Sequence, residues 1–323
     1  MNFKQITNEI ESDLEIFEQT LNNVAGDSEL VVKEILDYIF KSKGKRIRPV
    51  LVYLCARLFG APTQSTHNAA ILIEIMHTAT LLHDDVVDKA HLRRGKTTLN
   101  SKWDDKTAVL TGDYLFAKAM KLATDNNEYH LFDIITPAIM SLSLGELQQM
   151  DKSKNFDIDE NKYFEIIKNK TAALMSVSCE AGAYTGGANQ KQIKTITEFG
   201  EILGMIFQIK DDILDYTGSN NTGKEVGVDI KEGKVTLPLI MTWRSLSEND
   251  KKILLYYWEK AAYCEGGQKF IINMVKNNNG ILLSNNIMLD YKNIANKMLA
   301  DLPNNKAKSA LSKLVDYVIE RDK

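Results

Sequence analysis

Apolar residues recur at three- and four-residue spacing along most of the chain, which is the period of an amphipathic helix. The alternation that marks a half-buried strand is not sustained anywhere, and there is no repeat of fixed period. The pattern therefore predicts a single all-α domain over residues 1–323. The expected helices cover residues 5–22, 28–40, 49–59, 64–87, 100–124, 128–150, 158–186, 189–216, 248–262, 267–276, 288–301 and 304–320.

Two stretches depart from this pattern of half-polar helices. Residues 64–87 are apolar on most sides, so we expect this helix to be buried within a bundle. Residues 217–234 carry four glycines and three lysines, a composition typical of a mobile loop that covers phosphate groups. The chain has only five prolines and 18 glycines, which favours long helices over a loop-rich β protein.

Composition narrows the setting of the protein. Apolar residues make up 44% and charged residues 26% of the chain, and a net charge of −3 gives no reason to expect nucleic acid as a partner. Cys55, Cys179 and Cys264 are widely spaced and odd in number, so we expect reduced core thiols and a cytoplasmic location. The N-terminal segment lacks the features of a secretory signal, and no window is apolar enough to span a membrane.

Two copies of a DDxxD pattern, with first aspartates at positions 84 and 211, each end a long apolar helix. Positions i and i+4 share one helix face, so Asp84 and Asp88 point the same way about one turn apart. Two such carboxylates repel each other unless a cation lies between them. Oxygen ligands of this kind suit Mg²⁺, which commonly bridges carboxylates to phosphate oxygens. The two patterns consist of Asp84, Asp85 and Asp88, and of Asp211, Asp212 and Asp215.

Basic residues gather before and after the first acidic pattern. The stretch KSKGKRIRP is either a solvated basic turn or an anion site, in which a helix opened by Pro49 reinforces Lys45 and Arg48. A nucleic-acid patch would need interleaved aromatic residues, which this stretch lacks. Arg93 and Arg94 either cap the preceding helix or bind an anion.

Two acidic patterns that face one cavity would hold two or three Mg²⁺ ions, and the natural ligand of such a site is a diphosphate clamped by arginine and lysine. The sequence shows neither a Ser/His/Asp arrangement nor a reactive cysteine, so nucleophilic catalysis by the protein is not expected. Histidine and cysteine spacings match no zinc site. What remains is a metal-assisted departure of diphosphate, which leaves a carbocation.

Several motifs occur in a fixed order between Gly44 and Pro238: GKxxRP, HxxxLLHDDxxD followed by RRG, a KT pair, QxxDDxxD and a GK-rich loop ending in TLPL. In this the chain resembles the trans-type polyprenyl synthases, which add isopentenyl diphosphate to allylic diphosphates. The resemblance implies an isoprenoid-synthase-type fold around a central cavity, Mg²⁺-dependent prenyl transfer and a homodimer. Two other classes stay open: a class I terpene cyclase, whose second acidic motif usually differs, and a non-catalytic synthase subunit, which typically loses acidic motifs.

The resemblance also implies roles for the matching residues. Backbone carbonyls near Lys170 and Thr171 and the amide of Gln208 would stabilise the carbocation, and the diphosphate product would take the proton. His77 alone would more often be a core histidine, but here it joins the substrate site. Isopentenyl diphosphate would be held by Lys45, Arg48, His77 and Arg94; Mg²⁺ by Asp84, Asp88 and Asp211, with Asp85, Asp212 and Asp215 in support; and the allylic diphosphate by Arg93, Lys170, Thr171, Gln208, Lys224 and Lys234.

Product length depends on what lies beneath the first acidic pattern. Short-chain members of the resembled family often place an aromatic residue four or five positions before the first aspartate, where this chain has Thr80 and Ala79. Met76 lies one turn deeper, and Met140 and Leu144 are candidates for a deeper floor. We therefore expect a long product, with octaprenyl diphosphate favoured, farnesyl diphosphate as primer and at most transient membrane contact. A farnesyl or geranylgeranyl product is the alternative.

Overall fold

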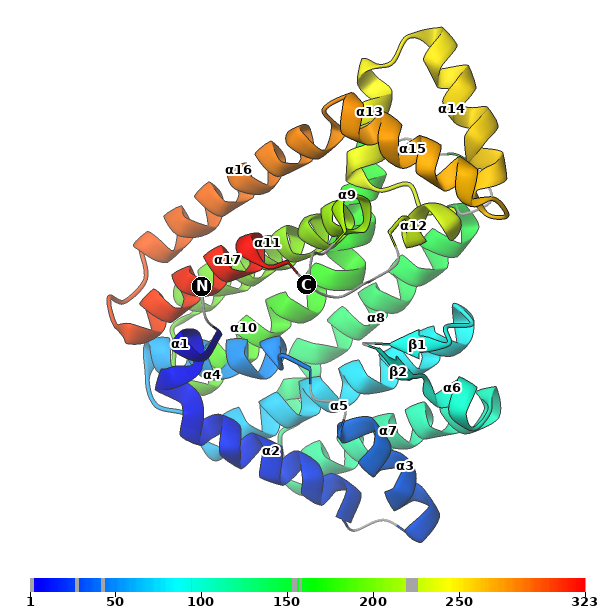
Figure 1. The fold of residues 1–323 in the computed structure, drawn as a ribbon. Helices are drawn as coiled ribbons and strands as arrows, with labels where there is room; N and C mark the ends of the chain where they lie inside the picture. Colours follow the sequence, from blue (N-terminus) through cyan, green and yellow to red (C-terminus); the bar gives the residue numbers. More distant parts are fainter. Residues whose placement is uncertain are drawn as a thin grey trace.

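The computed structural model describes residues 3–26, 29–41, 44–93, 95–152, 156, 159–218 and 226–322, and these are mainly helical (Figure 1). The first half contains α1 (Phe3–Thr7), the 3₁₀ turn η1 (Asn8–Ile10), α2 (Glu11–Gly26), α3 (Leu30–Phe40), α4 (Ile47–Phe59), α5 (Gln64–Val87), β1 (Leu92–Arg93), β2 (Lys96–Thr97), α6 (Leu99–Lys102), α7 (Asp105–Asp125) and α8 (Tyr129–Lys152). The second half contains α9 (Glu160–Ile167), the π-helical turn η2 (Lys168–Ala172), α10 (Ala173–Thr185), α11 (Gln190–Thr217), α12 (Val228–Lys231), α13 (Leu237–Ser245), α14 (Glu248–Ala261), α15 (Glu265–Asn277), α16 (Gly280–Ala300) and α17 (Lys306–Glu320).

The prediction of an all-α fold is confirmed, but several boundaries were wrong. Helix α4 begins at Ile47, so Pro49 is its third residue and still lies in the first turn, where a missing N–H costs no helical bond. The predicted helix over 100–124 is broken at Trp103, and Asp104 caps a new helix. Helix α16 begins eight residues earlier than predicted, after Asn279 in a left-handed conformation.

Short elements escaped the pattern altogether. Strands β1 and β2 form an antiparallel hairpin of two residues each, which is too short to show alternation. Helix α13 was not predicted, and α12 lies inside the stretch 217–234 that was expected to be a loop. Residues 219–225 of that stretch lie outside the described residues, so the prediction of a phosphate-covering loop stays a prediction there.

The two helices that carry the acidic patterns begin in the same way. Thr63 and Thr66 form a reciprocal capping box at the start of α5, and Asn189 and Gln192 form one at the start of α11. These bonds satisfy backbone N–H groups that have no partner inside the helix. Most of α5 is buried, as its apolar pattern predicts. Each helix therefore runs through the core and carries its acidic pattern at its C-terminal end.

Helix α10 is the centre of the packing. It lies against α11, α4, α8 and α5, and α7 packs along α5 (Figure 1). Most buried apolar residues form one core cluster that reaches from α1 to α17. A second, smaller cluster lies where α14 and α15 project from the bundle. Its members include Tyr216, Ile230, Leu239, Leu254 and Ile271, from α11 to α15.

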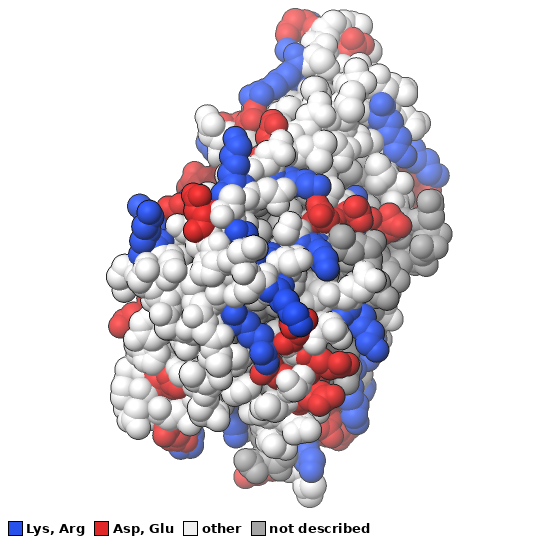
Figure 2. Space-filling view, turned by 90° about the vertical axis from the view of Figure 1, so that its left-hand side faces the viewer, with Lys and Arg blue, Asp and Glu red and all other residues white. Residues whose placement is uncertain are grey.

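The structure also shows where the three cysteines and the surface charges lie. Cys55 and Cys179 are buried free thiols, as predicted, whereas Cys264 is exposed, so its assignment to the core was wrong. The reason is that Cys264 is the N-cap of α15 and lies outside the helical period. Figure 2 shows acidic and basic side chains interspersed over one face of the molecule. Among the described helices, none is long and apolar enough to cross a bilayer.

Candidate active site

The first acidic pattern lies at the C-terminal end of α5, and Asp88 is the first residue beyond the helix. The unsatisfied carbonyls of a helix C-terminus carry partial negative charge, so carboxylates there are destabilised without a nearby cation. Burial and then the charge of Glu146 raise the pKa of Asp84 to about 6, although Lys170 and Arg93 oppose this shift. A carboxylate in such surroundings is suited to bind a cation.

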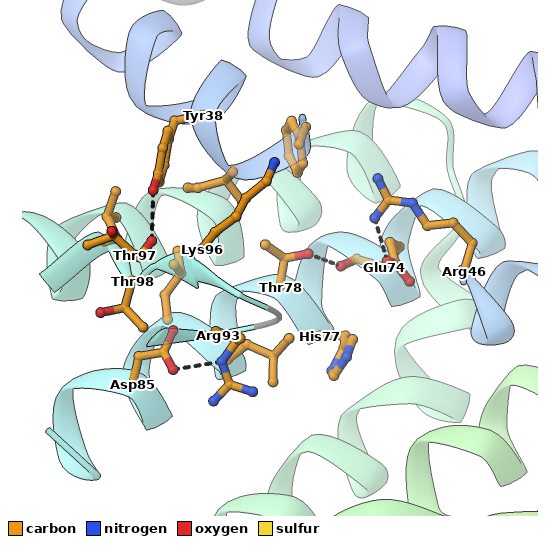
Figure 3. Close-up of a pocket in the computed structure, with 15 residues that line it drawn as sticks. Tyr38, Arg46, Glu74, His77, Thr78, Asp85, Arg93, Lys96, Thr97 and Thr98 are labelled. Atoms are coloured by element: carbon orange, nitrogen blue, oxygen red, sulfur yellow. Dashed lines mark hydrogen bonds and ion pairs between the residues drawn. The ribbon is translucent and has the colours of Figure 1, made fainter. Parts of the chain in front are cut away.

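Asp85 holds the β-hairpin against α5. Its side chain is buried, and its Oδ1 accepts a hydrogen bond of 2.6 Å from Nε of Arg93 on β1 (Figure 3). Its backbone carbonyl accepts a second bond, of 3.3 Å, from the amide of Asn100. Burial raises the pKa of Asp85, and the ion pair with Arg93 opposes the shift. This geometry suits a supporting role for Asp85. Arg94 lies outside the described residues.

Asp212 is the most enclosed carboxylate of the second acidic pattern. The hydroxyl of Tyr163 on α9 donates to its Oδ2 at 2.6 Å, and the amide of Gln208 donates to its Oδ1 at 2.8 Å. Oε1 of Gln208 in turn accepts a bond of 2.7 Å from the hydroxyl of Thr171. Burial raises the pKa of Asp212, and the charge of Asp229 adds to the shift. Three residues predicted for the site therefore form one hydrogen-bonded chain.

The backbone of the predicted Lys-Thr pair is the π-helical turn η2. Such turns inside longer helices are frequent at functional sites. Helix α11 approaches this turn so closely that a Cβ on Gly204 would lie 2.4 Å from Cα of Ala172. One turn further along α11, Gln208 then reaches Thr171. The close approach of two backbones thus fixes the polar contact between two predicted site residues.

The outer carboxylates of the second pattern have different partners. Oδ1 of Asp211 accepts a bond of 2.8 Å from Nη2 of Arg321, which directly follows α17. Asp215 accepts bonds from the backbone N–H groups of Val228 at 3.1 Å and Asp229 at 3.2 Å. Asp215 therefore anchors the start of α12, while Asp211 has a cationic partner that a bound metal would share or displace.

Lys170 approaches the first acidic pattern from η2. Its Nζ lies 2.6 Å from Oε1 of Glu146 on α8, and its charge acts on Asp84 against the rise in pKa described above. The elements α8 and η2, both distant in sequence from α5, thus contribute one carboxylate and one cation to the surroundings of Asp84.

Lys234 pairs with a glutamate close to the acidic patterns. Its Nζ lies 2.6 Å from Oε2 of Glu232. Burial lowers the pKa of Lys234, but the charges of Glu232, Asp88 and Asp229 outweigh this effect and raise it overall. Lys234 therefore interacts with Asp88 of the first pattern and with Asp229, whose backbone N–H donates to Asp215 of the second. Lys224 lies outside the described residues.

Of the residues predicted for isopentenyl diphosphate, Lys45 and Arg48 lie at the start of α4, and Arg48 contacts His77 on α5. Nη1 of Arg48 and Nε2 of His77 are 2.9 Å apart, and this contact joins α4 to α5. Nζ of Lys45 lies 5.0 Å from the ring centroid of Tyr317 on α17, a cation–π distance. Next to these residues, a pocket of about 100 Å³ lies between α3, α5 and the hairpin (Figure 3). Its wall includes Arg46, Glu74, His77, Asp85 and Arg93.

The predicted determinants of product length divide into two groups. Three of them are buried in α5 beneath the first acidic pattern: Met76, Ala79 and Thr80. Met140 and Leu144 are 72% and 51% exposed on α8, so the prediction that they form a deeper floor is wrong for the single chain. The inward face of α8 carries Ala138 and Leu142 instead, because these positions are offset from the outer stripe of the helix.

Several residues near the acidic patterns were missed by sequence reasoning. Glu146, Tyr163 and Arg321 each contact a predicted site residue, yet they belong to ordinary helical patterns or follow the last helix. Their partners come from distant segments, so no local motif marks them. Asp229 had a signal, because it lies in the glycine- and lysine-rich stretch that was expected to cover phosphates.

The donor set of the site fits Mg²⁺. Asp84 and Asp88 would supply hard oxygen ligands about one helical turn apart, and the surroundings of Asp84 disfavour unneutralised negative charge. Within the described parts of the chain, no three His, Cys, Asp or Glu side chains converge closely enough to hold a metal by themselves. This arrangement suits a cation that keeps several waters and shares its remaining positions with substrate phosphates.

Comparison with known proteins identifies the family. Residues 29–275 match the family described as polyprenyl synthetase. Heptaprenyl diphosphate synthase component 2 of Bacillus subtilis is 33% identical, over 99% of this chain and 91% of that protein. The crystal structure of a decaprenyl diphosphate synthase from Rhodobacter capsulatus has a TM-score of 0.91 and 32% identity, over 100% of both chains. The chain belongs to the polyprenyl synthetase family.

A second solved structure adds information on ligands. The polyprenyl synthase from Caulobacter crescentus, solved with calcium and isoprenyl diphosphate, has a TM-score of 0.92 and 30% identity, over 100% of this chain and 98% of that one. The present chain is thus a prenyltransferase with the all-α isoprenoid-synthase fold. The names of its relatives include geranylgeranyl, heptaprenyl, octaprenyl and decaprenyl synthases, so membership of the family does not fix the product length.

Proposed function

We propose that the protein is a long-chain trans-polyprenyl diphosphate synthase, which adds isopentenyl diphosphate repeatedly to an allylic diphosphate in the presence of Mg²⁺. The observation that carries the proposal is the placement of two acidic patterns at the C-terminal ends of α5 and α11, with Lys234 interacting with Asp88 of the first and with Asp229, which contacts the second. The free thiols are in keeping with a cytoplasmic enzyme. A terpene cyclase would have no use for the basic start of α4.

Binding of the allylic diphosphate is assigned to cations that each have a carboxylate partner in the present structure. The pairs are Arg93 with Asp85, Lys170 with Glu146 and Lys234 with Glu232. Asp84, Asp88 and Asp211 would hold Mg²⁺, which when bound neutralises the diphosphate and assists its departure. The cationic side chains turn to the phosphate oxygens and stabilise the charge that grows on them as the C–O bond breaks.

The carbocation is stabilised by dipoles of the protein. Carbonyl groups of η2 and Oε1 of Gln208 present partial negative charge beside the allylic diphosphate site. Lys45, Arg48 and His77 hold isopentenyl diphosphate with its double bond towards the cation. The new C–C bond then forms, and the proton lost from the adduct passes to the released diphosphate.

A long product agrees with the small residues beneath the first acidic pattern. Ala79 and Thr80 are buried and leave no bulky side chain at this level of α5. We expect Ala79→Tyr to shorten the product towards farnesyl or geranylgeranyl diphosphate, because the ring would fill the space beneath Asp84. Mass spectrometry of the dephosphorylated products measures this, with Ala79→Ser as the size-matched control. An unchanged product distribution in Ala79→Tyr would contradict growth of the chain past this position.

A homodimer is part of the proposal. Helices α7 and α8 expose large apolar side chains that a second chain would cover: Leu110, Met120, Met140, Leu144 and Leu147. The relative named component 2 favours a second candidate, in which this chain is one component of a heteromeric synthase. Light scattering of the purified chain gives its oligomeric state. Prenyl transfer by that chain alone would decide for the homomeric enzyme.

The central experiment is a product analysis. The purified protein is incubated with Mg²⁺, isopentenyl diphosphate and farnesyl diphosphate, and the dephosphorylated products are sized by mass spectrometry. We expect one dominant long polyprenyl species, with octaprenyl favoured. Hydrocarbons without elongation would revive the cyclase, and unconverted primer would point to a missing partner component.

A further inference from the structure

Arg46 is a buried arginine that was not predicted as a site residue. It joins three helices next to the predicted isopentenyl diphosphate site. Nε of Arg46 lies 3.0 Å from Oε1 of Glu18 on α2. Its Nη1 lies 2.7 Å from Oε1 of Glu74 on α5, and Figure 3 shows this second ion pair. Only 10% of the Arg46 side chain is exposed. The guanidinium also lies 5.9 Å from the ring centroid of Phe17. Arg46 itself directly precedes α4, so its two ion pairs connect the start of α4 to α2 and α5.

The position of this arginine along the chain links it to the substrate site. Arg46 lies between Lys45 and Arg48, and Glu74 precedes His77 by one helical turn on α5. The pair Arg46–Glu74 therefore runs beside the contact between Arg48 and His77, and it joins the same two helices. One pocket is lined by Arg46, Glu74 and His77. The ion pair therefore lies next to His77, which is predicted to bind the substrate.

The backbone of Arg46 shows that this arrangement is maintained against a cost. Its φ of 51° lies in the left-handed region, which residues with a side chain rarely adopt. Burial lowers the pKa of Arg46, but Glu74 and Glu18 outweigh this effect and raise it overall, so the guanidinium stays charged. A buried ion pair is weak evidence for added stability, since desolvation offsets the attraction. A contribution to geometry is the more direct reason for such a pair beside a binding site.

We propose that Arg46 is a positioning residue for the isopentenyl diphosphate site. Its ion pairs with Glu18 and Glu74 hold the start of α4 against α5, and thereby set the distance between Lys45 and Arg48 on one side and His77 on the other. This inference rests on the proposed prenyl transfer. It assigns no contact with substrate to Arg46 itself.

Steady-state kinetics with both substrates tests the assignment. In Arg46→Gln we expect KM for isopentenyl diphosphate to rise about tenfold, while KM for farnesyl diphosphate stays within about twofold, because misplacement near one substrate costs binding of that substrate alone. Glu74→Gln should give the same split. The double variant should be no worse than Arg46→Gln alone, because Arg46→Gln already removes the ion pair with Glu74.

The chain offers a matched control, a second ion pair between α2 and α4. Arg57, near the other end of α4, pairs with the buried Asp13 of α2 at 2.7 Å, and it has no link to α5 among the interactions described. Arg57→Gln thus also breaks an ion pair between α2 and α4, but far along α4 from Arg48. We expect Arg57→Gln to lower the thermal unfolding temperature without changing either KM.

Three results would overturn the proposal. They are unchanged kinetics in Arg46→Gln, equal increases in KM for both substrates, or the same selective increase in Arg57→Gln. If Arg46→Gln does not fold, Arg46→Lys serves instead; it keeps the charge but lacks the fork that reaches both glutamates, and we expect a smaller shift of the same selectivity. Failure of the proposed function is separate, because the wild-type protein would then elongate no primer at all.

Discussion

The two acidic patterns share the DDxxD motif but have different surroundings. In the first, Asp85 accepts a bond from Arg93 on the hairpin, whereas the negative charges of Glu146 and Asp88 act on Asp84, which accepts no arginine bond among the described residues. In the second, Asp212 is enclosed by Tyr163 and Gln208. The second aspartate of each pattern is thus the buried one.

The patterns also differ in how their outer carboxylates are prepared for a cation. Asp84 and Asp88 share one face of α5 and lie at its negative end. Asp211 instead has Arg321 as a partner, and Asp215 is engaged with the backbone at the start of α12. The first pattern therefore has the surroundings of a ready cation site, while the second would bind a cation only after its partners rearrange.

The largest expected effect is the loss of a proposed metal ligand. Asp84→Asn and Asp211→Asn should each lower kcat by about 10³-fold or more, because charge on the departing diphosphate would no longer be neutralised. Circular dichroism should show an unchanged helical fold. Asp125→Asn, at an exposed ion pair with Lys121, is the control and should keep normal turnover. Near-normal turnover in either site variant would remove the metal assignment for that pattern.

A smaller effect is expected where a carboxylate is enclosed. Tyr163→Phe removes the donor to Oδ2 of Asp212 and leaves a buried acceptor unsatisfied. We expect the free energy of unfolding to fall by about 1–3 kcal/mol, and kcat to fall roughly tenfold through the chain that Gln208 and Thr171 continue. Chemical denaturation and turnover measure the two effects. Stability and kcat both equal to wild type would show that this enclosure of Asp212 contributes nothing.

Arg321→Gln tests the partner of Asp211. Removing the guanidinium removes a cation that competes with a metal for the same carboxylate. We therefore expect half-maximal activity at about threefold lower Mg²⁺ concentration. A Mg²⁺ titration of activity measures the change. A higher Mg²⁺ requirement would mean that Arg321 assists metal binding instead of competing with it.

The smallest effect concerns pH. Burial and then the charge of Asp215 raise the pKa of Asp229 to about 7. Between about pH 4 and 7 the folded, metal-free protein therefore keeps a proton that the unfolded chain has released, so its stability falls as pH rises through this window.

Asp229→Asn should remove this pH dependence. In chelator-treated protein, we expect the variant to unfold at a higher temperature than wild type at pH 8, and at the same temperature near pH 4. Thermal unfolding at the two pH values measures the difference. A difference that is equal at both pH values would show that the charge of Asp229 is not its cause.

Helical periodicity was sufficient to predict most of the fold. The apolar pattern of α5 and the position of each DDxxD at a helix end followed from the sequence, because both depend on local spacing. The partners of the carboxylates did not. Arg321 is 110 residues from Asp211, and Tyr163 is 49 residues from Asp212. Such contacts depend on how the helices pack, and a period within one helix carries no information about its neighbours.

The π-helical turn η2 changes which residues share one face of the helical segment from α9 to α10. A π turn accommodates one residue more than the α-helix around it, so side chains beyond it are rotated by about 100° relative to an uninterrupted helix. Tyr163 before the turn and Thr171 within it both reach side chains of α11 across this change of phase. Deleting one residue here would leave a continuous helix from α9 to α10. In that helix, Lys170 and Thr171 would be rotated away from Gln208. The rotation of this segment about its axis therefore matters for the candidate active site as much as its sequence does.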